Sequence, residues 1–296
     1  MGLLERMAIT AASHPFSYLN FRTMTRKDLD IAVEWAAQEG WNPGLYDADC
    51  FYQTEPQGFF MGFLDNQPIA CISALSYGPT FGFLGFYITR KEFRNQGYGI
   101  QVWDKAIDYL KTQNIGLDGV VEQQENYKKS GFKLAYNNAR YQLNSKKFNQ
   151  GDSNIVPVSS IPFDQLNKYD NQFFPVDRKT FLECWIKQPE STALAYVANN
   201  QIMGYGMIRK CRSGYKTGPL FADNFEVADK LFQSLVSSVE ENSPVFLDIP
   251  EINPNAAKLT SQHQMQKVFA TARMYTKSFP KLPIDRTFGI TTFEVG

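Results

Sequence analysis

The sequence lacks an excess of charge of either sign, and it lacks any long hydrophobic run. Thirty Lys and Arg residues balance thirty Asp and Glu residues, so the 296-residue chain has no net charge at pH 7. This balance excludes the broad basic surface of a general nucleic-acid-binding protein, although a local basic patch is compatible with it. No apolar run approaches the ~20 residues that cross a bilayer, and the initial MGLLERMAIT is too weakly apolar for a signal peptide. We expect neither a nucleic acid nor a membrane as partner.

Cysteine and histidine are also scarce. The sequence has no CxxC pair, and its six residues of these two types are Cys50, Cys71, Cys184, Cys211, His14 and His263. Zinc clusters and disulfide frameworks need such residues at short or regular spacings. We therefore expect no metal site and no disulfide framework, and a reducing cytoplasm is the compartment that fits best.

The chain is long enough for two domains, and it repeats itself. Three short patterns recur in the same order, 134, 130 and 133 residues apart: Asp65-Asn66-Gln67 with Asn199-Asn200-Gln201, Leu117-Asp118 with Leu247-Asp248, and Ala139-Arg140 with Ala272-Arg273. Three ordered matches at a nearly constant offset indicate a duplicated domain. A polar stretch with Gly and Pro predicts a linker at 144–158, between an N-terminal domain at 17–143 and a C-terminal domain at 159–296.

Both copies have the same predicted order of elements, because apolar residues recur with helical and strand periods in the same succession. The first copy has a helix at 26–40, a short segment at 47–54, a hairpin around 65–67, a strand at 81–90, a helix at 98–113, a strand at 115–122, a short helix at 126–131 and a final strand pair at 132–143. The second copy closes with strands at 267–276 and 287–296. This order predicts an α+β fold with mixed, mostly antiparallel sheets flanked by helices.

The clearest chemical signal lies between a strand and a helix. The strand ends at Ile88, and the loop Arg94–Gly99, with two glycines spaced by one residue, leads straight into the helix. The first N–H groups of a helix point outward at its positive end, and glycine lets the backbone come close to a phosphate there. A plain strand–helix turn is the alternative. A dinucleotide-binding fold fits less well, because Val102 stands where a third glycine is needed and an antiparallel meander precedes the loop.

The loop Arg94–Gly99 resembles the R/QxxGxG/A signature of the GNAT superfamily of N-acetyltransferases. Downstream, Tyr127–Phe132 resembles the family's Y-E-K-x-G-F segment, in the correct order along the chain. The whole chain is similar to tandem GNAT proteins with a YitH-like C-terminal domain of the holothin acetyltransferase type. The resemblance implies two tandem GNAT folds and an enzyme that uses acetyl-CoA as cosubstrate, with no metal.

The resemblance also implies a role for each matching residue. Backbone groups of Phe86, Tyr87 and Ile88 would pair with the pantetheine arm and polarise the acetyl carbonyl. Backbone N–H groups of the loop and the first helical turn would hold the pyrophosphate, namely those of Arg94, Asn95, Gln96, Gly97, Tyr98, Gly99 and Ile100. Tyr127 would donate a proton to the CoA sulfur, since a phenol with an ordinary pKa of about 10 is protonated at neutral pH.

The general base and the acceptor pocket are predicted with alternatives. Glu122 follows the buried strand and is the predicted base, the alternative being a solvated loop charge. Asp118 shares its face by the two-residue strand period, but its repeat at Asp248 favours a structural hydrogen bond in both copies. The family's acceptor pocket lies beside the first helices, so the expected substrate contacts are Trp41, Asn42, Tyr46 and Asp47, with a simple Pro-Gly turn as the alternative.

We expect an enzyme that moves an acetyl group from acetyl-CoA to a primary amine of a small molecule, by direct attack in a ternary complex. A CoA sensor without turnover is the alternative, and a peptide acceptor is a lesser variant. The second copy has Phe221–Glu226 in place of the glycine loop, where Asp223 or Asn224 could cap the helix. This predicts one acetyl-CoA site per chain, with Arg212–Lys216 as a weaker candidate for a replacement loop, and it leaves the oligomeric state open.

Overall fold

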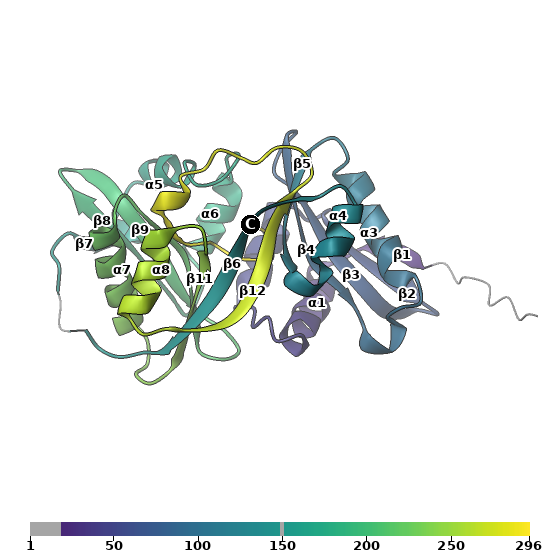
Figure 1. The fold of residues 1–296 in the computed structure, drawn as a ribbon, viewed down its shortest axis with the longest axis horizontal. Helices are drawn as coiled ribbons and strands as arrows, with labels where there is room; N and C mark the ends of the chain where they lie inside the picture. The colour runs from purple at the N-terminus through teal and green to yellow at the C-terminus, as the bar shows by residue number, and fades with distance from the viewer. Residues whose placement is uncertain (1–18, 149–150) are drawn as a thin grey trace, which may run out of the picture.

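The computed structural model describes residues 19–148 and 151–296, so the initial MGLLERMAIT and His14 lie outside the described residues. Figure 1 shows two halves side by side, each made of strands with helices packed on them. The first half contains β1 (Asn20–Thr23), α1 (Arg26–Gln38), α2 (Asp47–Thr54), β2 (Phe59–Leu64), β3 (Gln67–Ser76), β4 (Phe81–Thr89), α3 (Tyr98–Tyr109), β5 (Asn114–Val120), α4 (Gln124–Lys129) and β6 (Lys133–Asn144).

The second half follows the same order of elements. It contains β7 (Ile155–Pro157), α5 (Phe163–Asp170), α6 (Lys179–Trp185), β8 (Ser191–Ala198), β9 (Gln201–Lys210), β10 (Tyr215–Ala222), α7 (Phe225–Ser237), β11 (Pro244–Pro250), α8 (Pro254–Gln262), β12 (Gln266–Tyr275) and β13 (Thr287–Gly289). Within the described chain, β4–β5 and β10–β11 are the parallel pairs, and the other ladders are antiparallel. The predicted α+β class with mixed, mostly antiparallel pairing is therefore confirmed.

Local sequence signals account for several element boundaries. α1 begins with a capping box, in which Thr25 accepts from the backbone of Asp28 and the Asp28 carboxylate accepts from the backbone of Thr25. Asp65 and Asn66 both have positive φ, as a two-residue turn between β2 and β3 requires. α4 ends just before Gly131, whose φ is 87°.

The two halves exchange their last strands, which the sequence did not predict. β12 of the second half lies between β5 and β6, and β6 pairs on its other side with β11. One continuous sheet therefore runs through both halves, and residues 132–143 form one long strand instead of the predicted strand pair. Figure 1 shows β6 and β12 crossing the middle of the molecule.

Reciprocal buried ion pairs join the exchanged strands. The Arg273 guanidinium donates to Asp118 at 2.7 and 2.5 Å, and the Arg140 guanidinium donates to Asp248 at 2.7 and 2.8 Å. Each pair joins an aspartate of one half to an arginine of the other, with all four side chains at most 8% exposed. The predicted structural role of Asp118, shared with Asp248, is therefore confirmed.

The cysteine prediction was wrong at two positions. Cys50 on α2 and Cys184 on α6 form a disulfide between the halves, 134 residues apart. Because this separation equals a repeat offset, the two cysteines occupy corresponding places in the two copies, and the packing of α2 on α6 brings them together. The sequence prediction missed this pair because it considered only cysteines at short or regular spacings. Cys71 and Cys211 are free and buried.

The core also spans both halves, so the two copies are not independent units. Phe51 of α2 stacks on Trp185 of α6 with ring centroids 5.9 Å apart, within a cluster that includes Phe86 and Met207. The predicted linker at 144–158 contains β7, which pairs with β8 at the sheet edge. Of the closing strand predicted at 287–296, Thr287–Gly289 is a strand.

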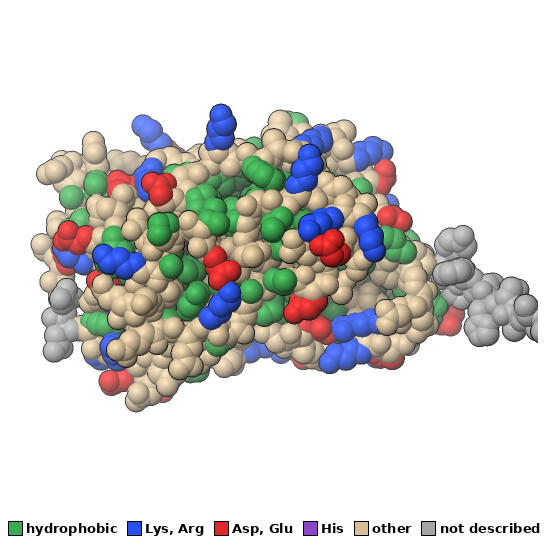
Figure 2. All heavy atoms as spheres, in the orientation of Figure 1, with side chains coloured by type: hydrophobic (Ala, Val, Ile, Leu, Met, Phe, Trp, Pro, Cys, Tyr) green, Lys and Arg blue, Asp and Glu red, His purple; other side chains and the backbone are tan. Residues whose placement is uncertain are grey.

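The molecular surface agrees with the balanced composition. On the face drawn in Figure 2, acidic and basic side chains are interspersed, and hydrophobic side chains gather near the middle, over the junction of the halves. None of the described helices is long and apolar enough to pass through a bilayer.

Candidate active site

The parallel strands β4 and β5 separate halfway along their length. Their ladder runs from Phe81–Asn114 to Leu84–Leu117 and then stops. At that point β4 is bulged against β3, because the register shifts between Cys71 and Ser73, and Phe86 adopts a φ of 47°, which is uncommon for a bulky residue. The bulge turns the next residues of β4 away from β5 and opens a gap between the strands.

A cavity of about 570 Å³ occupies this gap and the adjoining loop. It gathers residues from six separate stretches of the chain. Its lining includes Trp41, Phe86, Tyr87, Ile88, Arg94, Asn95, Gly97, Gly99, Ile100, Trp103, Asp118, Glu122, Tyr127, Phe269, Thr271, Phe293 and Glu294. Most of the residues predicted to bind acetyl-CoA thus line one cavity together with Tyr127, Glu122 and Trp41.

The loop before α3 has the geometry of an anion site. Gly97, with a φ of 79°, is the N-cap residue, and its missing side chain leaves the first N–H groups of α3 without a side-chain cap. The Arg94 guanidinium is held at the loop by the Thr89 carbonyl at 2.8 Å and by the Glu39 carboxylate at 2.6 Å. The open helix terminus and the fixed cation fit the pyrophosphate of acetyl-CoA.

Gln96 and Tyr98 belong to the same loop, but their side chains have other contacts. The Gln96 amide donates to the Glu92 carbonyl at 2.9 Å, and the Tyr98 ring packs edge-on against Phe93. The binding of pyrophosphate by the backbone N–H groups of these two residues stays a prediction.

Tyr127 is buried beside the gap between β4 and β5. Its ring stacks on Trp103 with centroids 5.5 Å apart. Gly119 on β5 makes room for it, because a Cβ there would come within 2.1 Å of the Tyr127 ring. Burial, and secondarily Tyr87, raises the pKa of the Tyr127 phenol above its ordinary value. The residue can therefore supply a proton over the whole physiological pH range.

Four carboxylates line the cavity, and two of them are neutralised. Asp118 pairs with Arg273, and Glu39 pairs with Arg94. Glu122, the predicted base, is exposed in the short 3-10 turn between β5 and α4, and Glu294 is buried near the C-terminus. Neither Glu122 nor Glu294 has a cation within ion-pair distance among residues 19–148 and 151–296.

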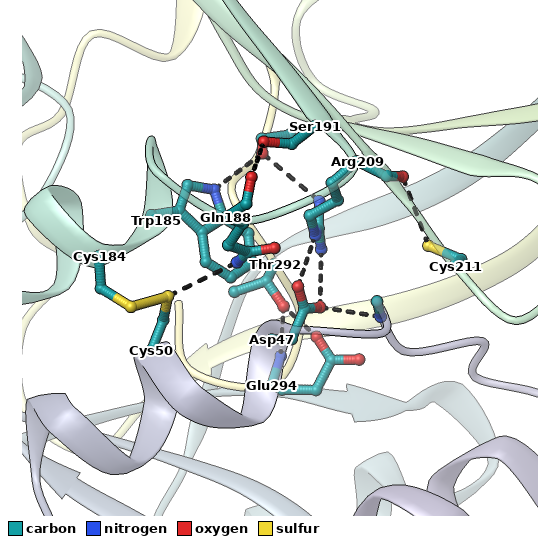
Figure 3. Close-up of polar contacts among 12 residues, drawn as sticks. Asp47, Cys50, Cys184, Trp185, Gln188, Ser191, Arg209, Cys211, Thr292 and Glu294 are labelled. Atoms are coloured by element: carbon teal, nitrogen blue, oxygen red, sulfur yellow. Dashed lines mark hydrogen bonds and ion pairs between the residues drawn. A yellow bond between two sulfur atoms is a disulfide. The ribbon is translucent and has the colours of Figure 1, made fainter. Parts of the chain in front are cut away.

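The predicted acceptor residues are divided by the structure. Trp41 lines the cavity. Asp47 is fully buried, and Figure 3 shows it directed at Arg209, which donates to it at 2.8 and 3.2 Å. Asn42 exchanges hydrogen bonds with the backbone of Ser213, and the Tyr46 hydroxyl donates to Glu190.

Asn42, Tyr46 and Asp47 thus connect the two halves, and this placement argues against the predicted substrate contacts. The sequence reasoning instead missed the cavity residues from the second half, Phe269, Thr271, Phe293 and Glu294. One signal was present, a glutamate between the apolar residues Phe293 and Val295 in a segment that otherwise reads as a closing strand.

The corresponding place in the second half is filled. Asn224 caps α7 by accepting from the backbone of Val227 at 3.0 Å, which occupies a donor that a phosphate would need. β10 and β11 also separate after three residue pairs, but there β13 pairs with β10 and Ile290 donates to the Asp248 carbonyl. The chain's own C-terminal segment thus occupies the gap that stays open in the first half.

Comparisons with known proteins agree with this architecture. The Acetyltransferase (GNAT) family model matches residues 27–132, and an Acetyltransferase (GNAT) domain model matches residues 166–289. The holothin acyltransferase of Pseudoalteromonas sp. is 27% identical over 271 residues, which cover 91% of this chain and 92% of that protein. The uncharacterized N-acetyltransferase YitH of Bacillus subtilis is 26% identical over 202 residues, covering 66% and 70% of the two chains.

Two solved structures show the same fold. A putative acetyltransferase from Pyrococcus horikoshii has a TM-score of 0.81 at 23% identity, covering 95% of this chain and 96% of its own. A tandem GNAT protein from the clavulanic acid biosynthesis pathway has a TM-score of 0.62 at 11% identity, with coverages of 87% and 98%.

The two family models fall one in each half, and the holothin acyltransferase relative extends over both halves. This division matches the repeated element order, with the open strand gap in the first half and its filled counterpart in the second. The resemblance found in the sequence is confirmed, and the chain belongs to the GNAT family of acetyltransferases as an enzyme with two GNAT domains in tandem.

Proposed function

We propose that this enzyme transfers an acetyl group from acetyl-CoA to a primary amine of a small-molecule acceptor, by direct attack within a ternary complex. One observation carries the proposal: the same cavity contains the open β4–β5 gap, the uncapped N-terminus of α3 and Tyr127. It also contains two carboxylates that have no cationic partner among the described residues. A site of this kind holds two reactants in close contact, which is the largest requirement of a direct transfer.

Acetyl-CoA would extend along β4 with its pyrophosphate at α3. Backbone groups of Phe86, Tyr87 and Ile88 would pair with the pantetheine arm and polarise the acetyl carbonyl. This is supported by the end of the β4–β5 ladder at Leu84, because the following residues of β4 face the cavity and not β5. The loop from Arg94 and the first turn of α3 would hold the phosphates.

The chemical step needs one proton donor and one proton acceptor. The amine nitrogen attacks the thioester carbon, the carbon–sulfur bond breaks, and Tyr127 gives its proton to the departing sulfur. Glu122 takes the proton that the amine loses, directly or through water. This role is supported by its position in the cavity lining and by the absence of a cation partner in the described chain.

The proposal is tested by the release of free CoA thiol from acetyl-CoA in the presence of amines. Holothin is a reasonable first acceptor, because a 27% identical relative is named a holothin acyltransferase. Tryptamine, benzylamine and a short peptide with a free N-terminus extend the panel, and the matching compounds without an amino group are controls. Amine-dependent thiol release and an acetylated product are expected. Tight acetyl-CoA binding without turnover on any amine would favour a sensor.

A further inference from the structure

The second half contributes part of the cavity wall. Phe269 and Thr271 reach the cavity from β12, which lies beside β5 because of the strand exchange. Phe293 and Glu294 reach it from the C-terminal segment. Part of the cavity wall is therefore made by residues of the second half, which the first GNAT domain alone would not contain.

The C-terminal segment is fixed at this wall by backbone contacts at Glu294 and at the two residues that follow it. The backbone carbonyl of Glu294 lies against Gly85, where a Cβ would come within 1.9 Å of the carbonyl oxygen. The Tyr77 hydroxyl donates to the Val295 carbonyl at 2.9 Å, and Arg178 donates to the Gly296 carbonyl at 3.3 Å. The Glu294 side chain thus has a fixed origin next to the point where β4 leaves β5.

The two arginines near this wall are paired with other carboxylates, so Glu294 has no cationic partner among the described residues. Two nitrogens of Arg209 bind Asp47, and two nitrogens of Arg140 bind Asp248. Glu294 is 3% exposed and accepts at Oε2 from the Thr292 hydroxyl, as Figure 3 shows. Its Oε1 has no hydrogen-bond partner in the described part of the chain. A buried carboxylate with one unused oxygen at a cavity wall favours a cationic or N–H-bearing ligand.

Lys216 is a buried cation that Glu294 influences electrostatically. Its Nζ has no hydrogen-bond partner within the described residues. Burial and Arg140 lower the pKa of its ammonium, whereas Glu294 raises it, so the two groups influence each other without forming an ion pair. Lys216 is absent from the cavity lining, so of these two groups only Glu294 would contact a ligand in the cavity.

Aromatic residues line the same cavity as Glu294. Phe269 and Phe293 lie 6.2 Å apart between centroids, and the Arg140 guanidinium lies over both rings at 5.8 and 5.1 Å. Arg140 also donates to the Trp41 carbonyl at 2.8 Å. One buried arginine therefore contacts three aromatic residues of the cavity lining, two through their rings and Trp41 through its carbonyl. An aromatic lining suits a flat apolar body.

From this arrangement we propose that Glu294 binds the amino group of the acceptor, and that the acceptor class is a small amine with a flat aromatic or heteroaromatic body. This inference rests on the proposed function, since it names the residue that would hold the nucleophile. Glu294 accepts a hydrogen bond from the amine at Oε1, while Trp41, Phe269 and Phe293 contact its body. Glu122 remains the group that takes the proton.

The test measures binding and transfer separately in Glu294→Gln. The glutamine keeps the shape of the side chain and its contact with Thr292 but removes the charge. Calorimetry is done on full-length protein saturated with free CoA, with holothin, tryptamine, benzylamine and 2-aminothiazole as amine probes and indole-3-ethanol as the analogue of tryptamine that lacks the amino group. Glu294→Asp, which keeps the charge, is the second variant. Glu241→Gln, at an exposed glutamate, is the matched control.

We expect the Kd of the amines to rise about 10- to 100-fold in Glu294→Gln, the loss of one hydrogen bond to a charged group. The Kd of acetyl-CoA and that of indole-3-ethanol are expected to stay at the wild-type level, as are all values in Glu241→Gln. Glu122→Gln is expected to lower kcat without raising the Kd of the amines. Glu294→Asp is expected to bind the amines with an affinity between those of the wild type and Glu294→Gln. If the glutamine variant does not fold, this second variant still shows whether the carboxylate is used.

Unchanged amine affinity in Glu294→Gln would overturn the inference, as would equal losses for tryptamine and indole-3-ethanol, or a wild-type protein that binds none of the amines. The proposed function and the role of Glu294 can be contradicted separately. A wild-type protein that binds amines through Glu294 but releases no CoA contradicts the proposed function alone. If the wild-type protein acetylates the amines and Glu294→Gln binds them as tightly as the wild type does, only the role of Glu294 is contradicted.

Discussion

Replacing Gly99 by aspartate separates acetyl-CoA binding from folding. Gly99 is the second residue of α3, and a Cβ there would lie 2.9 Å from Tyr87 Oη and 3.0 Å from Thr89 Oγ1. Both atoms are ends of side chains that can move by a few tenths of an ångström. A carboxylate in the first helical turn also interacts favourably with the helix dipole, by about 0.3–1 kcal/mol. We therefore expect the Gly99→Asp protein to unfold at the wild-type temperature or slightly above it.

The same carboxylate should abolish tight binding of acetyl-CoA. It places a negative charge at the predicted pyrophosphate site and competes for the N–H groups of the first turn. Each charge-assisted hydrogen bond contributes about 1.5–3 kcal/mol. Losing two of them costs about 3–6 kcal/mol, which raises the Kd roughly 10²–10⁴-fold.

Calorimetric titration with acetyl-CoA, together with a thermal melt, checks both effects. Gly99→Ala is the matched control, because it adds the Cβ without the charge and should weaken binding far less. The defect of the aspartate variant should shrink as salt screens the repulsion. An aspartate variant that binds as tightly as wild type would refute the assignment of the loop. Equal losses in both variants would show that the effect is steric.

Three further outcomes are expected. Tyr127→Phe should lower kcat by roughly 10²–10⁴-fold with an unchanged Kd for acetyl-CoA; an unchanged kcat would mean that sulfur takes its proton elsewhere. Titration should give one acetyl-CoA per chain, and a site that survives Gly99→Asp would contradict the filled gap in the second half. Arg273→Met should destabilise the protein by about 3–5 kcal/mol at neutral pH in urea unfolding, because it leaves Asp118 buried and unpaired. Burial raises the pKa of Asp118 and Arg273 opposes this, so the variant's deficit should shrink as acid protonates Asp118, and a deficit independent of pH would contradict this account.

The parts of the site that could be predicted are those encoded within one short segment. The loop Arg94–Gly99 and Tyr127 carry their chemistry in local spacing, since a strand, a glycine turn and a helix start are consecutive in the chain. The pseudo-equivalence of Asp118 and Asp248 was likewise visible as a repeat. Local patterns therefore sufficed for the order of elements in each half and for the loop and tyrosine that meet in the cavity.

The acceptor side could not be predicted, because it depends on how the copies combine. Nothing in the local sequence of β12 indicates that it lies beside β5, yet this exchange brings Phe269 into the cavity. Asp47 follows aromatic residues in the sequence, as a carboxylate of a substrate pocket could, but Arg209, 162 residues away, binds it in the interior. The disulfide of Cys50 and Cys184 was hidden in the same way, although its spacing matched the repeat.

The C-terminal segment explains why a duplicated fold would retain one site. Residues Thr287–Ile290 fill the gap between β10 and β11, where the second copy would otherwise offer a pantetheine channel. The segment then crosses to the first half, and Glu294 and Val295 are held against Gly85 and Tyr77. Filling one gap thus places these last residues at the other, so the same ten residues occupy the gap of one copy and add a charged wall to the cavity of its counterpart. The absence of glycine from Phe221–Glu226 agrees with this arrangement, because a copy whose gap is filled has no use for an open helix terminus.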